Sequence, residues 1–287
     1  MIDLEKNGKI ATGVKSKNIY KPNQTEDFKI SRSKFDNFLT CQRCFYLDVV
    51  KGFKEPGTPG WALNSRTDGL LKKEFDKCRE KKLSHPFLIK KKLDHIIPYN
   101  NKNIAKNYKD EVIRYSKTKK PYSCIDAWRT NSHGLQYKIK DTNIILYGSV
   151  DDIWLNTKNN ELIVVDYKSQ AKDEEVKQDK YFDDEYKSGY QTQIDIYAYL
   201  LSKQNLENVV CKYGYLYVVN ARGLEEEFDN KIIFEPALIK VNIDNDYLED
   251  KIQQMINLIN SKNLPKPNKS CKNCAYARQR SKTDRAG

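Results

Sequence analysis

The sequence predicts an α/β fold, because stretches with helical spacing and stretches with strand alternation follow one another along the chain. The chain has 287 residues, of which 39% are hydrophobic, so it is long enough to bury a sizeable core. Residues 1–28 lack periodicity and are expected to form a loosely ordered arm. We expect a single domain over residues 29–287, with a helical N-terminal part and an inserted segment.

Two helices are predicted in the first third of the chain. The first opens near Ser31, where Ser33 and Asp36 resemble a capping box. A turn rich in proline and glycine over residues 56–60 precedes the second helix. The apolar positions that mark the two helices are Phe35, Phe38, Leu39, Leu63, Leu70, Leu71 and Phe75. Residues 81–120, rich in Lys and Asn, are expected to form an inserted segment of mixed structure that contacts a nucleic-acid backbone.

Strand patterns dominate the second half. Residues 134–168 alternate and predict a β-meander, and further strands are expected over residues 212–219 and 238–243. Tyr213, Tyr215 and Tyr217 share one strand face, which favours packing under a helix over stacking on bases. A final amphipathic helix is marked by Leu248, Ile252, Met255, Ile256 and Ile259.

Polar side chains close one of the apolar strands. Asp166, Tyr167 and Lys168 end it, and alternation places Asp166 and Lys168 on the same face, with Tyr167 on the other. Turn-forming residues 156–160 predict a hairpin that brings Asp151 toward Asp166. Two carboxylates beside one lysine suit an oxygen-ligated Mg2+ or Mn2+ ion for phosphodiester hydrolysis, with Lys168 positioning or activating the water.

A following helix carries Gln193 and Tyr197 four residues apart, so both lie on one helix face that can flank the metal site. Three ordered motifs are therefore present: Gly148 with Asp151, Asp166 with Lys168, and Gln193 with Tyr197. In these motifs the chain resembles the PD-(D/E)XK nuclease superfamily, and more narrowly its RecB-like branch, which includes CRISPR adaptation nucleases. The resemblance implies a restriction-endonuclease-like core, in which helices flank a central mixed β-sheet.

The resemblance also implies the roles of individual residues. Asp151, Asp166 and the backbone carbonyl of Tyr167 are expected to bind the metal ion, and Lys168 to assist the nucleophilic water. Gln193 and Tyr197 are expected to support the site or the DNA. Many members carry a metal-binding histidine on an earlier helix, and this chain has none there. Asp68 is the candidate substitute, and Glu74 is a weaker one.

Two C-x-x-C pairs, Cys41 with Cys44 and Cys271 with Cys274, have the spacing that lets two thiolates bind one metal centre. Iron-sulfur members of the branch join an N-terminal cysteine to three near the C-terminus, which implies a [4Fe-4S] cluster on Cys41, Cys271 and Cys274. Arg280 stands where those members place the last cysteine, and Cys44 offers a fourth thiolate instead. A cluster, Zn2+ and no metal at all stay open. The other cysteines, Cys78, Cys124 and Cys211, are expected to pack as small buried apolar groups.

Composition agrees with a nucleic-acid partner and excludes other classes. The formal net charge is +12, which favours a polyanion, although a surface rich in lysine can also be merely solubilising. No apolar run of about 18 residues predicts a membrane span, and the polar N-terminus lacks the core of a signal peptide, so a cytoplasmic protein is expected. A phosphate-binding loop of the ATPase type is also missing.

The sequence therefore predicts a Mg2+-dependent DNA nuclease that acts on ends or single strands in recombination, repair or phage DNA metabolism, with exonuclease action as the expected mode. Two alternatives stay open: a catalytically inactive nucleic-acid-binding or assembly protein that retains the fold, and a nuclease directed at RNA. Resemblance to the branch also implies a helicase or recombination protein as a partner.

Overall fold

The computed structural model describes residues 13–286, except residues 16, 54, 56–59, 224–226 and 228. Residues 1–12 of the predicted arm and residues 56–59 of the predicted turn lie outside the described residues. The chain divides into two compact units, Trp61–Leu248 and Met1–Gly60 together with Glu249–Gly287. The predicted division into an arm and one domain stays a prediction.

The larger unit is built on a six-stranded sheet with the order β2-β5-β6-β8-β9, to which β7 adds by pairing with β6. Strands β6 and β8 run parallel, whereas β5 and β9 pair antiparallel with their neighbours, so the sheet is mixed. The predicted α/β class with a central mixed sheet is confirmed. The strands are β2 Ile96–Pro98, β5 Asp152–Asn156, β6 Glu161–Ala171, β7 Val209–Val210, β8 Tyr213–Ala221 and β9 Glu235–Asn242.

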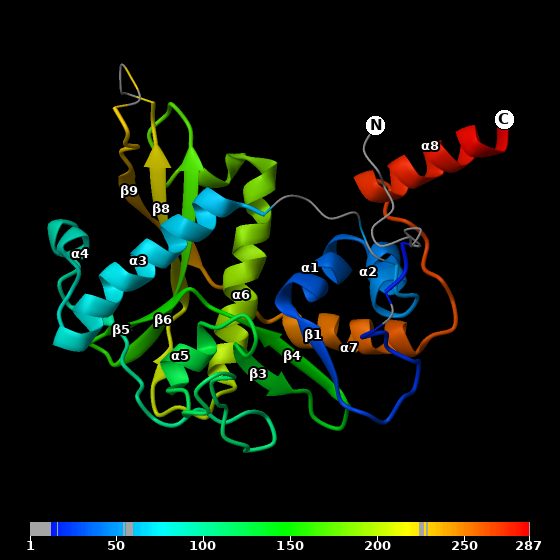
Figure 1. The fold of residues 1–287 in the computed structure, drawn as a ribbon, viewed down its shortest axis with the longest axis horizontal. Coiled ribbons are helices and arrows are strands. Elements are labelled where there is room, and N and C mark those ends of the chain that lie inside the picture. Colours follow the sequence, from blue (N-terminus) through cyan, green and yellow to red (C-terminus); the bar gives the residue numbers. More distant parts are fainter. Residues whose placement is uncertain are drawn as a thin grey trace. The chain divides into compact units, whose positions relative to one another are not determined.

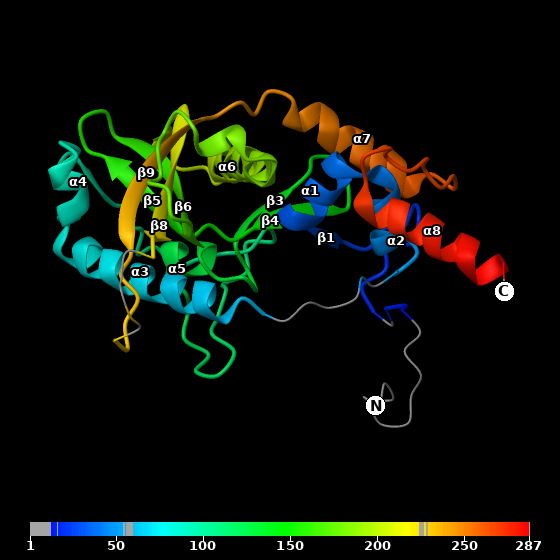
Figure 2. The ribbon, with the colours of Figure 1, turned by 90° about the horizontal axis from the view of Figure 1, so that it is seen from above.

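Helices α3 (Ala62–Lys81) and α6 (Ser188–Ser202) lie on opposite sides of this sheet (Figure 1, Figure 2). Strand alternation explains the arrangement, because Tyr167 of β6 packs against Phe75 of α3 while its neighbours face α6. Helix α6 has a largely apolar sequence and is buried over most of its length. The connection from β6 through α6 to the parallel strand β8 is a βαβ unit.

An aromatic cluster fills the space between α3 and the sheet. The ring of Phe75 lies 5.1 Å from Trp154, 5.5 Å from Tyr167 and 5.2 Å from Tyr217. Phe75 and Trp154 are fully buried, and each such ring pair contributes about 0.5–1.5 kcal/mol beyond burial. Tyr215 is also buried here, so the prediction that the tyrosine stripe packs in the core is confirmed.

The prediction of one meander over residues 134–168 is wrong, because this stretch forms two hairpins in two sheets. Strands β3 (Leu135–Lys138) and β4 (Ile144–Gly148) pair with each other outside the six-stranded sheet, and β5 pairs with β6 inside it. The chain leaves the first sheet at Val150, whose N–H donates to the carbonyl of Trp128 (3.1 Å). Trp128 ends the short helix α5 (Cys124–Trp128), so this contact redirects the chain between the two hairpins.

The inserted segment has the mixed structure that was predicted. It contains helix α4 (Pro86–Lys90) and strand β2, and isolated bridges join its remaining turns. Two short 3-10 helices, η1 (Tyr181–Asp183) and η2 (Glu185–Lys187), precede α6.

The smaller unit contains β1 (Phe28–Ser31), α1 (Arg32–Thr40), α2 (Gln42–Val49), α7 (Leu248–Asn260) and α8 (Lys272–Ala286). The predicted capping box is wrong: Ser31, not Ser33, caps α1 by accepting the N–H of Lys34 at 3.3 Å. The apolar positions predicted for the final amphipathic helix are all buried in α7. Tyr20, in the segment predicted as an arm, is 1% exposed and donates to Asn260 Oδ1 at 2.8 Å.

No helix in the described part of the chain combines the length and apolarity needed to cross a membrane.

Candidate functional site

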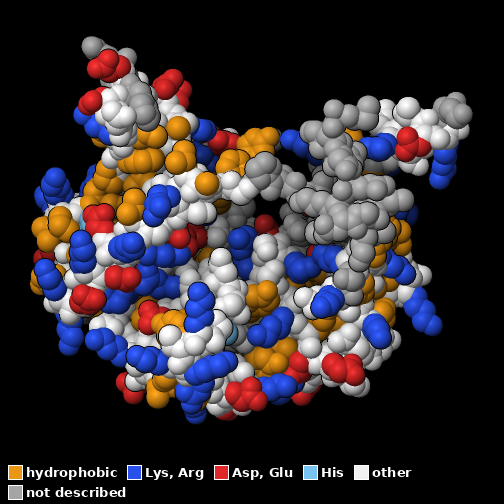
Figure 3. Space-filling view, viewed as in Figure 1, with side chains coloured by type: hydrophobic (Ala, Val, Ile, Leu, Met, Phe, Trp, Pro, Cys, Tyr) orange, Lys and Arg blue, Asp and Glu red, His pale blue; other side chains and the backbone are white. Residues whose placement is uncertain are grey.

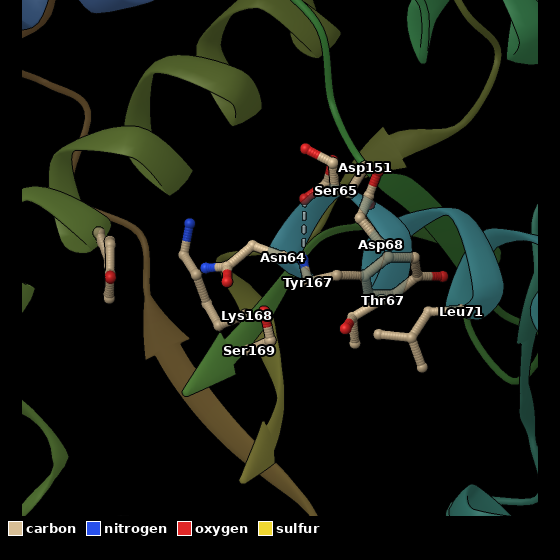
Figure 4. A pocket seen from close by; sticks show the side chains of 10 residues that line it. Asn64, Ser65, Thr67, Asp68, Leu71, Asp151, Tyr167, Lys168 and Ser169 are labelled. Carbon is tan, nitrogen blue, oxygen red and sulfur yellow. Dashed lines mark hydrogen bonds between the residues drawn. The ribbon is translucent and has the colours of Figure 1, made fainter. Parts of the chain in front are cut away.

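The β5–β6 hairpin positions the first two acids. Its register pairs Asp152 with Val165, which places Asp151 beside the end of the apolar part of β6. Asp151 Oδ2 accepts the backbone N–H of Tyr167 at 2.9 Å (Figure 4). The predicted hairpin is thus present, and a hydrogen bond ties Asp151 to the residue that follows Asp166.

Asp166, Lys168 and Gln193 form one hydrogen-bonded group. The Lys168 ammonium pairs with Asp166 Oδ2 and donates to Gln193 Oε1 at 3.0 Å. Gln193 Nε2 donates to Asp166 Oδ1 at 2.7 Å and to the Tyr197 hydroxyl at 3.3 Å. The Gln193 amide therefore uses its acceptor on the lysine and its donors on the acid and the tyrosine. This geometry fixes Asp166 and Lys168 relative to each other from α6.

The surroundings of Lys168 keep its amine charged. Burial acts to lower the pKa of Lys168, but the carboxylates of Asp166 and Asp151 outweigh burial and leave the pKa above its usual value. The ammonium also lies 4.2 Å from the centre of the Tyr190 ring, in a cation–π position. At neutral pH, Lys168 is thus a fixed positive charge in the site.

Helix α3 contributes a third acid and a second lysine. Lys72 Nζ donates to Asp68 Oδ2 at 2.9 Å and to Asp151 Oδ1 at 3.1 Å, so one ammonium bridges the two carboxylates. Burial and the neighbouring Asp151 raise the pKa of Asp68, and Lys72 opposes this rise. Lys72 did not emerge from the sequence reasoning, although its place one helical turn after Asp68 would have put both on one face.

A cavity of about 350 Å3 opens between the N-terminal half of α3 and the C-terminal half of β6 (Figure 4). Its lining consists of Asn64, Ser65, Thr67, Asp68, Leu71, Asp151, Tyr167, Lys168, Ser169 and Tyr190. Glu74, the weaker of the two helix candidates, does not line it and instead bonds through Oε1 to His85 Nε2 at 2.7 Å. Asp166 and Gln193 adjoin the cavity through Lys168.

The donor set fits a hard divalent cation. Among the described residues, Asp68 Oδ1 is a buried oxygen with no hydrogen-bond partner, an arrangement that is costly unless a cation or water completes it. Asp68, Asp151 and Asp166 supply carboxylate oxygen only, which suits Mg2+ or Mn2+. A cation bound between Asp68 and Asp151 would compete with the Lys72 ammonium for their oxygens.

A cluster of buried charged side chains stabilises the start of the β5–β6 hairpin. Asp152 is 0% exposed and accepts from Arg79 Nη2 at 2.5 Å and from the Tyr167 hydroxyl at 2.7 Å. Arg129 donates to the backbone carbonyl of Asp151 at 3.0 Å and to Asp76 at 2.7 Å. These contacts hold the backbone of residues 151 and 152 while the side chain of Asp151 faces the cavity.

The four cysteines of the two C-x-x-C pairs meet in the smaller unit. Their sulfur atoms all lie within 4.8 Å of one another, a spacing that can hold a metal ion. Of the other three thiols, Cys211 is buried, as predicted, whereas Cys78 and Cys124 are only half-buried.

A family model described as the PD-(D/E)XK nuclease superfamily matches residues 29–279. The match spans the mixed sheet, the acids of the β5–β6 hairpin and both cysteine pairs. The chain belongs to the PD-(D/E)XK nuclease superfamily, whose members are generally metal-dependent nucleases. A search of curated proteins found no match.

Proposed function

We propose that this protein is a Mg2+-dependent DNA nuclease that hydrolyses phosphodiester bonds. The observation that carries the proposal is that Asp68, Asp151 and Lys168 line one cavity, with Asp166 paired to Lys168 at its edge. The site thus combines carboxylates that can bind a divalent cation with the fixed positive charge of Lys168. The chain also belongs to a superfamily of nucleases.

Each residue has a separate part in the proposed reaction. Asp151, Asp166 and the carbonyl of Tyr167 would hold the cation, and Asp68 would add a ligand from α3. A divalent cation, when bound, neutralises charge on the phosphate and lowers the pKa of a bound water. Lys168 orients the attacking water and stabilises developing negative charge as an ammonium. Gln193 fixes the side chains of Asp166 and Lys168 relative to each other, and the Tyr197 hydroxyl accepts a hydrogen bond from the Gln193 amide.

We further propose DNA ends or single strands as the substrate, and recombination, repair or phage DNA metabolism as the setting. The net charge of +12 supports a polyanionic partner, and Lys and Arg side chains gather over the region of α3 (Figure 3). A helicase or recombination protein is the proposed partner. A reducing cytoplasm is the proposed compartment.

One observation favours a second candidate, a non-hydrolytic DNA-binding protein that retains the fold. The Lys72 ammonium already compensates Asp68 and Asp151 and so stands in for a cation there. This candidate predicts DNA binding that does not depend on Mg2+ and no cleavage.

The test compares the wild-type protein with Asp166→Ala and Lys168→Ala on labelled linear, circular, single-stranded and double-stranded DNA and on RNA. Reactions contain Mg2+, Mn2+ or a chelator. Matched controls are Asp94→Ala and Lys73→Ala, which remove exposed side chains of the same types. We expect metal-dependent cleavage of DNA by the wild type and both controls, and its loss in both site variants. Binding without cleavage in any metal supports the second candidate, and equal cleavage by the wild type and both site variants overturns the assigned site.

A further inference from the structure

The two C-x-x-C pairs are placed by the same local geometry. Cys41 immediately precedes α2 and Cys44 is its third residue, while Cys271 immediately precedes α8 and Cys274 is its third residue. In each pair, the first turn of a helix points both sulfur atoms to the same side, and the helix N-terminus favours thiolates. The two turns lie next to each other in space, although Cys41 and Cys274 are 233 residues apart in the sequence.

The distances between the sulfur atoms discriminate between kinds of metal centre. The Sγ atom of Cys44 lies 3.5 Å from the Sγ atoms of both Cys271 and Cys274, and Cys41 Sγ lies 3.8 Å from Cys274 Sγ. Four thiolates about 2.3 Å from one zinc ion form a tetrahedron whose edges are about 3.8 Å. In a [4Fe-4S] cluster, by contrast, each thiolate binds a different iron, so the eight atoms of the cluster spread the four sulfurs apart. With all four sulfurs within 4.8 Å of one another, there is room for one ion.

We propose that Cys41, Cys44, Cys271 and Cys274 bind a single structural Zn2+ ion and no iron-sulfur cluster. Four soft thiolates with no position left for water or substrate form the closed tetrahedral site that zinc occupies in a structural role. Cys41 and Cys274 are 3% and 8% exposed, whereas Cys44 and Cys271 are half-buried, so the protein covers two of the four ligands almost completely. The iron-sulfur centre implied by the resemblance to the RecB-like branch therefore does not fit these residues.

The fourth ligand explains the difference from that branch. Arg280, which stands where iron-sulfur members place their last cysteine, has a side chain that is 68% exposed and pairs with Asp284 at 3.8 Å. Arg280 thus points to solvent, and Cys44 completes the set from the N-terminal side. Two ligands come from each end of the chain.

The surroundings stabilise this arrangement. Asn268 Nδ2 donates to the carbonyl of Thr40 at 2.8 Å, and Arg43 donates to the carbonyl of Pro265 at 3.0 Å. These hydrogen bonds hold the segment that precedes α8 against the start of α2, and a bound zinc ion would stabilise this contact.

The metal content of the full-length protein, purified anaerobically without chelators, tests the proposal directly. We expect one zinc per chain by elemental analysis, no acid-labile sulfide, and a colourless protein. Replacement by Co2+ is expected to give the visible absorption of a tetrahedral thiolate site. Iron with sulfide, a single iron in place of zinc, or no bound metal would each overturn the proposal.

Variants connect the ion to these residues. Cys44→Ser and Cys271→Ser are expected to lose the zinc, whereas Cys78→Ser and Cys124→Ser, matched changes at half-buried thiols outside the group, keep it. If the first two variants do not fold, titration of the wild type with a mercurial reagent still decides the point. Release of one zinc as four thiolates react supports the proposal, and no zinc release overturns it. Asp166→Ala is expected to retain its zinc, so this result is independent of nuclease activity.

Discussion

Removal of the positive charge of Arg79, which pairs with Asp152 at the start of the β5–β6 hairpin, should destabilise the larger unit strongly. Arg79→Met leaves the Asp152 carboxylate, which is 0% exposed, without its ion-pair partner. Asp152 keeps hydrogen bonds from Tyr167, Ile153 and Trp154, but these donors carry no formal charge.

The magnitude follows from the geometry of this pair. A buried charge that loses its partner costs about 3–5 kcal/mol. Arg129 remains near Asp152 and offsets part of this cost, so we expect a decrease of about 3 kcal/mol in the free energy of unfolding. For a unit of this size, each kcal/mol corresponds to about 2–4 °C, which gives a decrease in Tm of about 6–12 °C.

Urea unfolding followed by tryptophan fluorescence measures this change, because the buried Trp154 indole donates to Asp152. Arg66→Met, at an exposed position of the same helix, is the matched control and should change stability by less than about 0.5 kcal/mol. The double variant Arg79→Met/Asp152→Asn should recover at least about 1 kcal/mol, because the unpaired charge is gone. A loss below about 1 kcal/mol in Arg79→Met, or no recovery in the double variant, would refute this reasoning.

Three further perturbations test other parts of the structure. Gln193→Ala removes hydrogen bonds to the charged side chains of Asp166 and Lys168. It should lower the single-turnover cleavage rate by about 10- to 100-fold with little change in DNA affinity. A larger loss of affinity than of rate would contradict the role of Gln193 in positioning these two side chains. Gly134→Ala should lower Tm, because φ of Gly134 is +67° and the added Cβ would lie 2.5 Å from the carbonyl oxygen of Gly148. Gly69→Ala adds a methyl group in open space on a helix and should raise stability by about 0.5–1 kcal/mol. Equal effects of the two substitutions in thermal unfolding would contradict the close approach of Gly134 to Gly148. Burial raises the pKa of Asp195 to about 6, so the native state binds a proton that the unfolded chain releases, and the stability contributed by this group falls as pH rises from about 4 to about 6. Asp195→Asn should therefore gain stability relative to the wild type at pH 7 compared with pH 4, and a pH-independent difference in Tm would contradict the assignment.

The parts of the site that lie close in sequence could be predicted. The turn between β5 and β6 sets the register of a hairpin, so Asp151 had to lie beside the part of β6 that carries Asp166 and Lys168. Helical spacing likewise placed Gln193 and Tyr197 on one face. The structure adds that the Gln193 amide bonds to both Asp166 and Lys168.

Contacts that depend on tertiary packing could not be predicted. Lys72 bridges Asp68 and Asp151 only because α3 lies against β6, which no local pattern specifies. Asp152 reads as a second acid of the motif, yet its carboxylate is fully buried and pairs with Arg79, whereas the carboxylate of Asp151 lines the cavity. Helix α8 was missed because its residues are mostly exposed and it lacks an apolar stripe.

The rate of DNA cleavage by Asp151→Asn in a single turnover with saturating Mg2+ tests the central claim most directly. This substitution retains size and the acceptor for the Tyr167 N–H but removes the charge that would bind the cation. We predict a rate lower than that of the wild type by on the order of 100-fold or more, with DNA affinity changed by only a few-fold. A rate equal to that of the wild type would contradict the claim that the carboxylates of this cavity hold a catalytic divalent ion.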